Sequence, residues 1–170
     1  LWFGMFSGGI SFYDMKTKKF RQVFPEDKAT MDVRSIYEDK DRIVWIATSE
    51  GVYKAGLSDK KIIGHYDFEN NLIRSIIKDS QGRIWVGSFG GGLGVYAGEF
   101  EYLMHFSTAD QFPSNTINAI YEDSKHRIWI ATGEGLVCFP SLSSWEYKTY
   151  RREEGLENTY IFAITEDAKG

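Results

Sequence analysis

The chain has 170 residues, of which 20 are Lys or Arg and 24 are Asp or Glu, so its formal net charge at pH 7 is −4. This balance argues against a nucleic-acid clamp, because a protein that neutralises many phosphates usually carries a basic surplus. With 42% hydrophobic and 16% aromatic residues, the chain is also unlike a disordered protein. We therefore expect a folded core and no nucleic-acid partner for this segment.

No stretch approaches the ~20 apolar residues of a membrane-spanning helix. The chain opens on Leu1 without an initiator Met or a signal-peptide pattern. We interpret it as part of a longer protein, with any membrane contact made outside this segment. The single cysteine, Cys138, excludes an internal disulfide and a CxxC metal site, and we expect it to be a small buried strand residue.

The chain is a succession of one repeated unit. Its clearest copies are RSIYEDKDRIVWIATSEGVY at 34–53, RSIIKDSQGRIWVGSFGGGLGVY at 74–96 and NAIYEDSKHRIWIATGEGLVCF at 118–139. A fourth copy is divided between the ends: 1–14 matches the later part of the unit, and 158–170 matches its beginning. The unit recurs every 40 to 44 residues, counted at Trp2, Trp45, Trp85 and Trp129. Repeats of this length are typical of propellers and solenoids.

Each unit predicts four short strands, A to D. Strand A, such as VRSIYE, precedes a tight turn in which Asp caps backbone amides and Gly tolerates positive φ. Strand B, such as RIWIAT, is an almost continuous apolar run suited to burial on both faces. Strand C follows the next Gly, and strand D alternates apolar and polar residues like a half-exposed outer strand. No helical stripe of period 3.6 occurs.

Four-stranded antiparallel units at this spacing predict an all-β protein, a β-propeller in which each unit is one blade. The expected boundaries are strands B to D of a blade at 1–24, blades at 32–68, 72–107 and 116–151, and strand A of a further blade at 158–170. Either 158–170 closes onto 1–24 in a four-bladed ring, or the chain is an arc of a larger ring. We favour the arc, because four-bladed closure needs a large rotation between neighbouring blades.

Residues that recur in every unit are expected to be structural. We expect the Trp of strand B to pack between blades, since a binding residue need not recur. The pairs at 38–39, 122–123 and 166–167, each Glu-Asp, are predicted to cap turns and not to act as paired catalytic carboxylates, because adjacent strand residues point to opposite faces.

Other apparent motifs are also expected to carry no chemistry. GLGVYA at 92–97 fits a GxGxxA dinucleotide pattern, but a predicted strand follows it where a helix would be needed. His65, His105 and His126 lack the spacing of a metal site. We therefore expect no cofactor, no metal and no catalytic residue in this segment.

The repeated pattern resembles the two-component regulator propeller repeat: an inner strand ending in Glu-Asp, a short turn, an Ile-Trp-Ile strand and a Gly-Leu strand. IYEDSKHRIWIATGEGL at 120–136 is the clearest copy, and the resemblance covers essentially the whole chain. It departs from the pattern where Arg42 and His126 replace the turn Gly, and where the first blade lacks strand A. In that family such repeats form large propellers, typically seven-bladed and often paired, in the periplasmic sensor of hybrid histidine kinases that regulate polysaccharide use.

The resemblance therefore implies signal input: a periplasmic ligand-sensing segment of a hybrid two-component sensor that responds to an oligo- or polysaccharide. Its expected partners are the remaining blades and sensor domains of the same protein, in a full-length homodimer. Binding would act by shifting the populations of two sensor arrangements. Two alternatives stay open. One is a structural or protein-interaction propeller, and the other is a carbohydrate-active enzyme propeller such as a lyase or glycosidase.

Candidate ligand-binding residues are the non-recurrent ones in the D-to-A and B-to-C loops, because these loops vary while the sheets hold them in place. One varying position at the start of strand A carries Arg34, Arg74, Asn118 and Phe162. Guanidinium groups there suit a sulfate or uronate, although pairing with acids such as Asp32 or Glu50 is the alternative.

Aromatic residues give further loop candidates. Phe6 and Phe89 occupy the same place in the B-to-C loops of two blades, where the ring would either stack on a sugar or pack beneath the loop. Tyr160, Phe112 and the stretch EEGLENTY at 153–160 are candidates with the same two interpretations.

Overall fold

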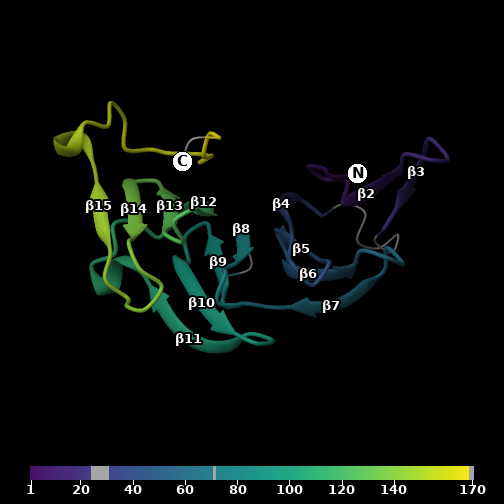
Figure 1. The fold of residues 1–170 in the computed structure, drawn as a ribbon, viewed down its shortest axis with the longest axis horizontal. Coiled ribbons are helices and arrows are strands. Elements are labelled where there is room, and N and C mark those ends of the chain that lie inside the picture. Colours follow the sequence, from purple (N-terminus) through teal and green to yellow (C-terminus); the bar gives the residue numbers. More distant parts are fainter. Residues whose placement is uncertain (24–30, 71, 169–170) are drawn as a thin grey trace. The chain divides into compact units, whose positions relative to one another are not determined.

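The computed structural model describes residues 1–23, 31–70 and 72–168 (Figure 1). Within these residues the regular elements are β-strands and two short 3-10 helices, Thr108–Asp110 and Arg152–Glu154. The chain divides into two compact units, Leu1–Ile76 and Ile77–Gly170. Phe24, Lys169 and Gly170, which the expected boundaries include, lie outside the described residues.

The described strands form antiparallel sheets in which strands that follow one another in sequence lie side by side. A three-stranded sheet contains β1 (Trp2–Gly4), β2 (Ile10–Asp14) and β3 (Lys19–Gln22). The next sheet contains β4 (Val33–Glu38), β5 (Ile43–Thr48), β6 (Gly51–Gly56) and β7 (Ile62–Tyr66). Two more sheets contain β8 (Ile73–Lys78), β9 (Ile84–Ser88), β10 (Leu93–Ala97) and β11 (Glu101–Phe106), and β12 (Ile117–Glu122), β13 (Ile128–Thr132), β14 (Gly135–Phe139) and β15 (Lys148–Tyr150). The predicted all-β fold of four-stranded antiparallel blades is confirmed.

Residues 158–168 differ from the prediction, because the structure assigns them to no strand. A strand is defined by a ladder of hydrogen bonds to a neighbour. In the three four-stranded sheets, strand A pairs with the strand B that follows it in sequence, and the described chain ends before such a strand. The segment is attached instead by isolated hydrogen bonds, one of which runs from the Ile161 N–H to the Thr132 carbonyl at 3.0 Å.

One buried aspartate organises each turn between strands A and B. Asp79 is only 3% exposed. Its Oδ1 accepts the N–H groups of Gln81 and Arg83, both at 2.9 Å, and its Oδ2 accepts the indole N–H of Trp85 at 2.8 Å. Asp39 and Asp123 make the same three kinds of bond in their own blades. The predicted turn cap is confirmed, and the six-residue spacing from Asp to Trp follows from this shared carboxylate.

The last turn residue has positive φ in all three blades: 62° at Arg42, 85° at Gly82 and 59° at His126. This region favours glycine, and other residues adopt it at some cost. The turn nevertheless has the same hydrogen bonds with Arg or His as with Gly. We attribute this tolerance to the aspartate cap, because its Oδ1 accepts two backbone N–H groups of the turn, one before and one after this residue.

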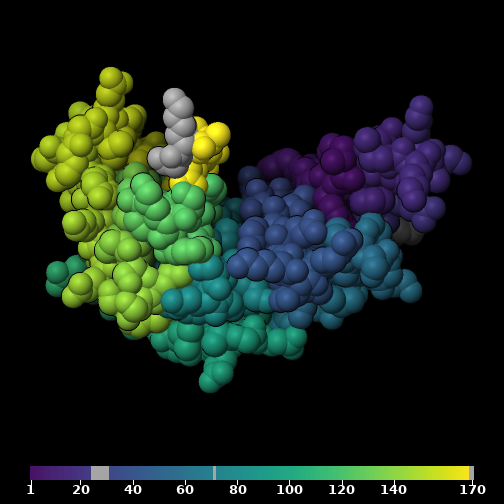
Figure 2. All heavy atoms as spheres, viewed as in Figure 1, coloured from purple at the N-terminus to yellow at the C-terminus, as the bar shows by residue number. Residues whose placement is uncertain are grey.

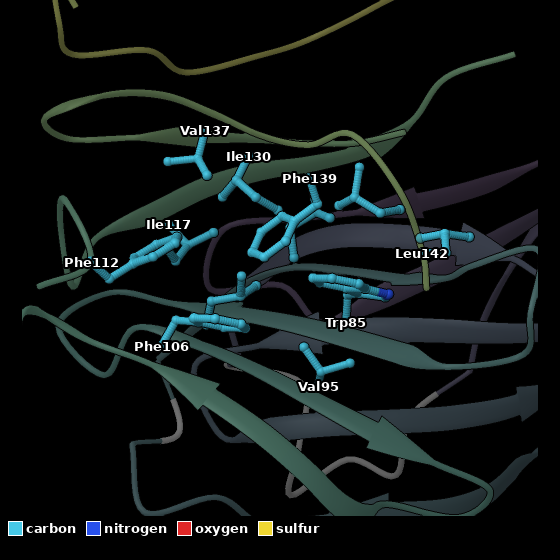
Figure 3. Close-up of a cluster of buried hydrophobic side chains, with 12 residues drawn as sticks. Trp85, Val95, Phe106, Phe112, Ile117, Ile130, Val137, Phe139 and Leu142 are labelled. Carbon is cyan, nitrogen blue, oxygen red and sulfur yellow. The ribbon is translucent and has the colours of Figure 1, made fainter. Parts of the chain in front are cut away.

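Trp85 packs against the neighbouring blade, as expected of the strand B Trp, whereas Trp45 and Trp129 have ring contacts with Tyr66 and Tyr150 of their own blades. Figure 3 shows Trp85 close to Phe139, and the two ring centres are 5.2 Å apart. Phe106 and Phe112 join the same buried cluster from the blade that carries Trp85 and the segment that follows it. The core of this unit therefore lies between its two sheets.

The glutamate of the recurrent Glu-Asp pair caps the turn of the preceding blade. Glu122 Oε2 accepts the Ser80 N–H at 2.9 Å, and Glu166 Oε2 accepts the Ser124 N–H at 2.9 Å. Neighbouring strand residues point to opposite faces, so Asp123 holds its own turn while Glu122 reaches across. The predicted capping role therefore extends from one blade to the next.

We expect Asp79→Ala to lower the free energy of unfolding by roughly 2 to 4 kcal/mol, because the buried indole N–H of Trp85 would lose its acceptor and the turn its cap. Chemical denaturation followed by circular dichroism measures this change. Glu157, an exposed loop residue, provides the control, and Glu157→Ala should cost less than about 0.5 kcal/mol. Equal effects of the two substitutions would contradict the role of Asp79.

Asp123 should contribute a pH-dependent part of the stability. Burial raises the pKa of its carboxyl, but hydrogen bonds from the Trp129 indole, from Arg127 and from the Lys125 N–H outweigh burial and lower the pKa from 3.8 to about 2. Because the folded-state pKa is depressed, the stabilisation is complete above about pH 4 and is lost as the pH falls towards 2. Unfolding measured from pH 5 to 2 should show this loss in the protein, and Asp123→Asn should reduce it. The same acid dependence in Asp123→Asn would show that other carboxyls cause it.

Candidate functional site

In the first unit the structure brings Phe6 and Arg34 together. The Arg34 guanidinium carbon lies 5.3 Å from the centre of the Phe6 ring. Arg34 Nη2 also donates to Asp32 Oδ2 at 3.0 Å, and the Ser7 N–H donates to Asp32 Oδ1 at 2.8 Å. Asp32 therefore joins the loop after β1 to the residues just before β4. The acid pairing left open by the sequence is present for Arg34.

This cluster of Phe6, Ser7, Asp32 and Arg34, here called the arginine cluster, is open to solvent. The Arg34 side chain remains 43% exposed despite its ion pair, and Phe6 is more exposed still. A guanidinium has five N–H donors in a fixed plane, so the Asp32 bond orients it without using every donor. A positioned guanidinium beside an exposed ring can bind an anionic or polyhydroxylated ligand.

Arg74 occupies the second position of β8, as Arg34 does in β4. Its side chain is half-buried and already takes part in an interaction. The second position of strand A is therefore an arginine in both blades, exposed at Arg34 and half-buried at Arg74.

In the second unit the structure brings Asn118, Tyr160 and Phe162 together. The Tyr160 and Phe162 ring centres are 4.9 Å apart with planes at 47°. The Asn118 side-chain amide donates to the Ile161 carbonyl at 2.7 Å, and so fixes the backbone between the two rings. Figure 2 shows this C-terminal segment, in yellow, at the surface of the second unit. We call Asn118, Tyr160 and Phe162 the aromatic cluster.

Phe89 lies in the loop that connects β9 and β10, and forms an isolated bridge with Thr116. Thr116 is in turn bonded through its carbonyl to the Gly133 N–H at 3.1 Å. A Cβ added at Gly133 would lie 3.5 Å from the Tyr160 ring. Beside Gly133, the Thr132 carbonyl accepts the Ile161 N–H at 3.0 Å, so backbone contacts lead from the Phe89 loop to the segment that carries Tyr160 and Phe162.

Phe112 follows the second interpretation left open by the sequence, packing beneath its loop. It is only 2% exposed and packs against Phe106 and Tyr147, with ring centres 5.5 and 5.2 Å away. The short 3-10 turn at Thr108–Asp110, followed by Gln111 with φ of 64°, brings the ring back beneath the loop. An apolar loop residue gives no sequence signal for the side on which it will lie.

Sequence reasoning missed Ser7 and Thr116, and named Asp32 only as a competing acid. An Asp and an Arg two positions apart in an extended segment share one face, so the sequence Asp32-Val33-Arg34 did contain a signal for the ion pair. The backbone contacts of Ser7 and Thr116 have no such signal, because any residue can supply an N–H or a carbonyl.

Within the described ranges, no three His, Cys, Asp or Glu side chains converge as a metal site. Cys138 is buried as expected, and burial raises the pKa of its thiol, so the reactive thiolate is disfavoured. No helix among the described residues is long and apolar enough to cross a membrane.

Comparison with known proteins adds independent information. Residues 28–50, 67–90 and 111–134 match the family described as "Two component regulator propeller". Histidine kinase P4 of Formosa agariphila is 30% identical to this chain in a match that covers 54% of this chain and 8% of that protein.

Solved structures also resemble the chain. The extracellular domain of a putative hybrid two-component system from B. thetaiotaomicron is 48% identical, with a TM-score of 0.93 over 99% of this chain and 24% of that one. A second such domain from the same organism is 20% identical, with a TM-score of 0.77 over 99% of this chain and 26% of that one. A virginiamycin B lyase from Staphylococcus aureus is 14% identical, with a TM-score of 0.64 over 85% of this chain and 49% of that one. The last two likenesses show the fold alone.

The exposed rings should contribute little to stability. Phe162 is 70% exposed, whereas Phe139 is fully buried. We expect Phe162→Ala to change the free energy of unfolding by less than about 0.5 kcal/mol, and Phe139→Ala to lower it by roughly 3 to 5 kcal/mol. Chemical denaturation of both variants tests the difference. A large loss in Phe162→Ala would mean that this ring is a packing residue.

Proposed function

The chain carries repeats of the two-component regulator propeller family, and from this premise we propose that it is an arc of the extracytoplasmic sensor propeller of a hybrid two-component signalling protein. The observation that carries the proposal is the 48% identity, over 99% of this chain, to the extracellular domain of such a system. The chain spans about a quarter of that domain. Its proposed neighbours are therefore further blades, other sensor domains and, outside this segment, a membrane anchor and kinase. We place the sensor in the periplasm, as a homodimer with rings of the seven-bladed type.

We propose that the sensed ligand is an oligo- or polysaccharide bound by the B-to-C and D-to-A loops. Aromatic faces pack on the apolar C–H faces of sugars, while guanidinium and amide groups bind hydroxyl, carboxylate or sulfate oxygens. The arginine cluster offers a ring beside a charged donor, and the aromatic cluster offers two rings beside an amide. Arg74 and Phe89 are the remaining candidate contacts.

The proposed activity of this segment is binding and not catalysis. The recurrent carboxylates Asp39, Asp79 and Asp123 are buried in turns, where indole and backbone N–H groups already occupy them. A bound saccharide acts only through its difference in affinity for two arrangements of the sensor. Binding to loops of more than one blade would supply such a difference.

We expect the full-length sensor to bind one member of a panel of neutral, sulfated and uronate-containing oligosaccharides, measured by titration calorimetry. Phe162→Ala should weaken that binding about tenfold, because one ring contact contributes roughly 1 to 1.5 kcal/mol. Tyr102 is similarly exposed but lies on the outer strand β11, so Tyr102→Ala should leave the affinity unchanged.

Two results would contradict the proposal. Signalling that is intact without binding to any saccharide of the panel would favour a protein-interaction propeller. Cleavage of a bound saccharide by the purified sensor region would favour an enzyme.

A further inference from the structure

The B-to-C loop of the third sheet carries Phe89 followed by three glycines, so its own sequence does little to fix its shape. Gly90 and Gly92 have φ of 90° and 82°, in the region that glycine adopts readily. Both of their N–H groups donate to the Asn115 carbonyl at 2.9 Å. One side of the loop is therefore attached to the segment that leads into β12.

The other side of the loop is attached to the outer strand of its own blade. His105 of β11 places Nε2 2.7 Å from the Gly91 carbonyl oxygen. A carbonyl only accepts hydrogen bonds, so Nε2 carries the proton and donates it. The imidazole therefore links the outer strand to the residue that lies between the two glycines bound to Asn115.

The same link occurs in two other blades. His65 Nε2 donates to the Glu50 carbonyl at 2.8 Å, while its ring stacks on Tyr53 at 4.1 Å. In the fourth sheet, the Arg151 Nε donates to the Glu134 carbonyl at 3.3 Å. In each case the acceptor directly precedes the glycine that begins or leads into strand C.

The fourth sheet shows that the donor of this hydrogen bond need not come from one fixed register position of the outer strand. His65 lies opposite Tyr53, and His105 lies opposite Gly94. The residue at that register in the fourth sheet is Thr149, opposite Val137, and the longer Arg151, two positions further on, makes the bond instead. A shared acceptor with different donors indicates that fixing this carbonyl matters.

We infer that His65 and His105 are positioning residues for the ligand-facing loops, and that His105 sets the place of Phe89. That these histidines hold the loops in place does not depend on the proposed function. The expected effect on ligand affinity rests on the proposed saccharide-binding function. His105 does not itself contact the ligand. It limits the conformations of a glycine-rich loop, so that the Phe89 ring is held in its binding position before the ligand arrives.

The experiment measures loop order and ligand affinity separately, both in the full-length sensor region. Hydrogen exchange of the Gly90 and Gly92 amides reports loop order without any ligand. We expect His105→Ala to accelerate this exchange roughly five- to tenfold, since one hydrogen bond that closes the loop is lost. Calorimetry with the saccharide bound by the unsubstituted sensor should show an affinity reduced by a similar factor.

Conservative variants separate positioning from a general loss of packing. The Gln amide nitrogen reaches about as far as imidazole Nε2, and the first sheet carries Gln22 at this register, opposite Ser11. His105→Gln should therefore restore slow exchange and affinity, whereas the shorter His105→Asn should not. His126, which bonds to Glu122 in a turn, provides the control, and His126→Asn should leave both readouts unchanged.

The outcomes distinguish the inference from the proposed function. Unchanged exchange in His105→Ala, or equal exchange in the Gln and Asn variants, would overturn the positioning role whatever the ligand. Faster exchange with unchanged saccharide affinity would support the loop link, but would remove Phe89 from the binding site. Faster exchange together with no saccharide binding in the unsubstituted sensor would support the link and contradict the proposed ligand.

Discussion

The buried aspartate in each A–B turn is the constraint on which the blade depends. A carboxylate with almost no solvent exposure is costly unless its lone pairs are occupied. Here two backbone N–H groups and one indole N–H occupy them. In two blades an arginine Nε also donates to the same carboxylate, at 2.8 Å from Arg83 and 2.6 Å from Arg127. One side chain thereby fixes both the turn and the orientation of the Trp indole.

Blades fixed in this way leave their connecting loops and the entry to strand A free to vary, and the candidate binding residues lie there. The arginine cluster and the aromatic cluster each join residues from two successive blades through short hydrogen bonds. The outer-strand histidines attach the B-to-C loops of the second and third sheets to their own blades. Rigid sheets and anchored loops suit recognition, because little order has to be gained when a ligand binds. The catalytic alternatives need a reactive group that the recurrent turns do not offer.

Sequence-based prediction succeeded wherever a residue type repeats with the unit. The spacing of Asp and Trp gave the blade, and the alternation of strand residues separated Glu122 from Asp123. At Phe112 it left two interpretations open, and the structure selects packing beneath the loop. Residues 158–168 match the start of the unit but form no strand, since no following strand B is described with which they could pair. It also identified the Glu as a cap without finding which turn it caps, since Ser80 lies 42 residues away.

The sequence by itself determined the all-β class, the four-stranded unit and the split between recurrent structural residues and variable loop residues, because these follow from local periodicity and turn chemistry. Only the tertiary structure decided which variable residues meet: Arg34 with Phe6, Asn118 with the backbone between two rings, and His105 with Gly91. These contacts join segments that are distant in sequence or use backbone groups common to all residues. No local pattern encodes them.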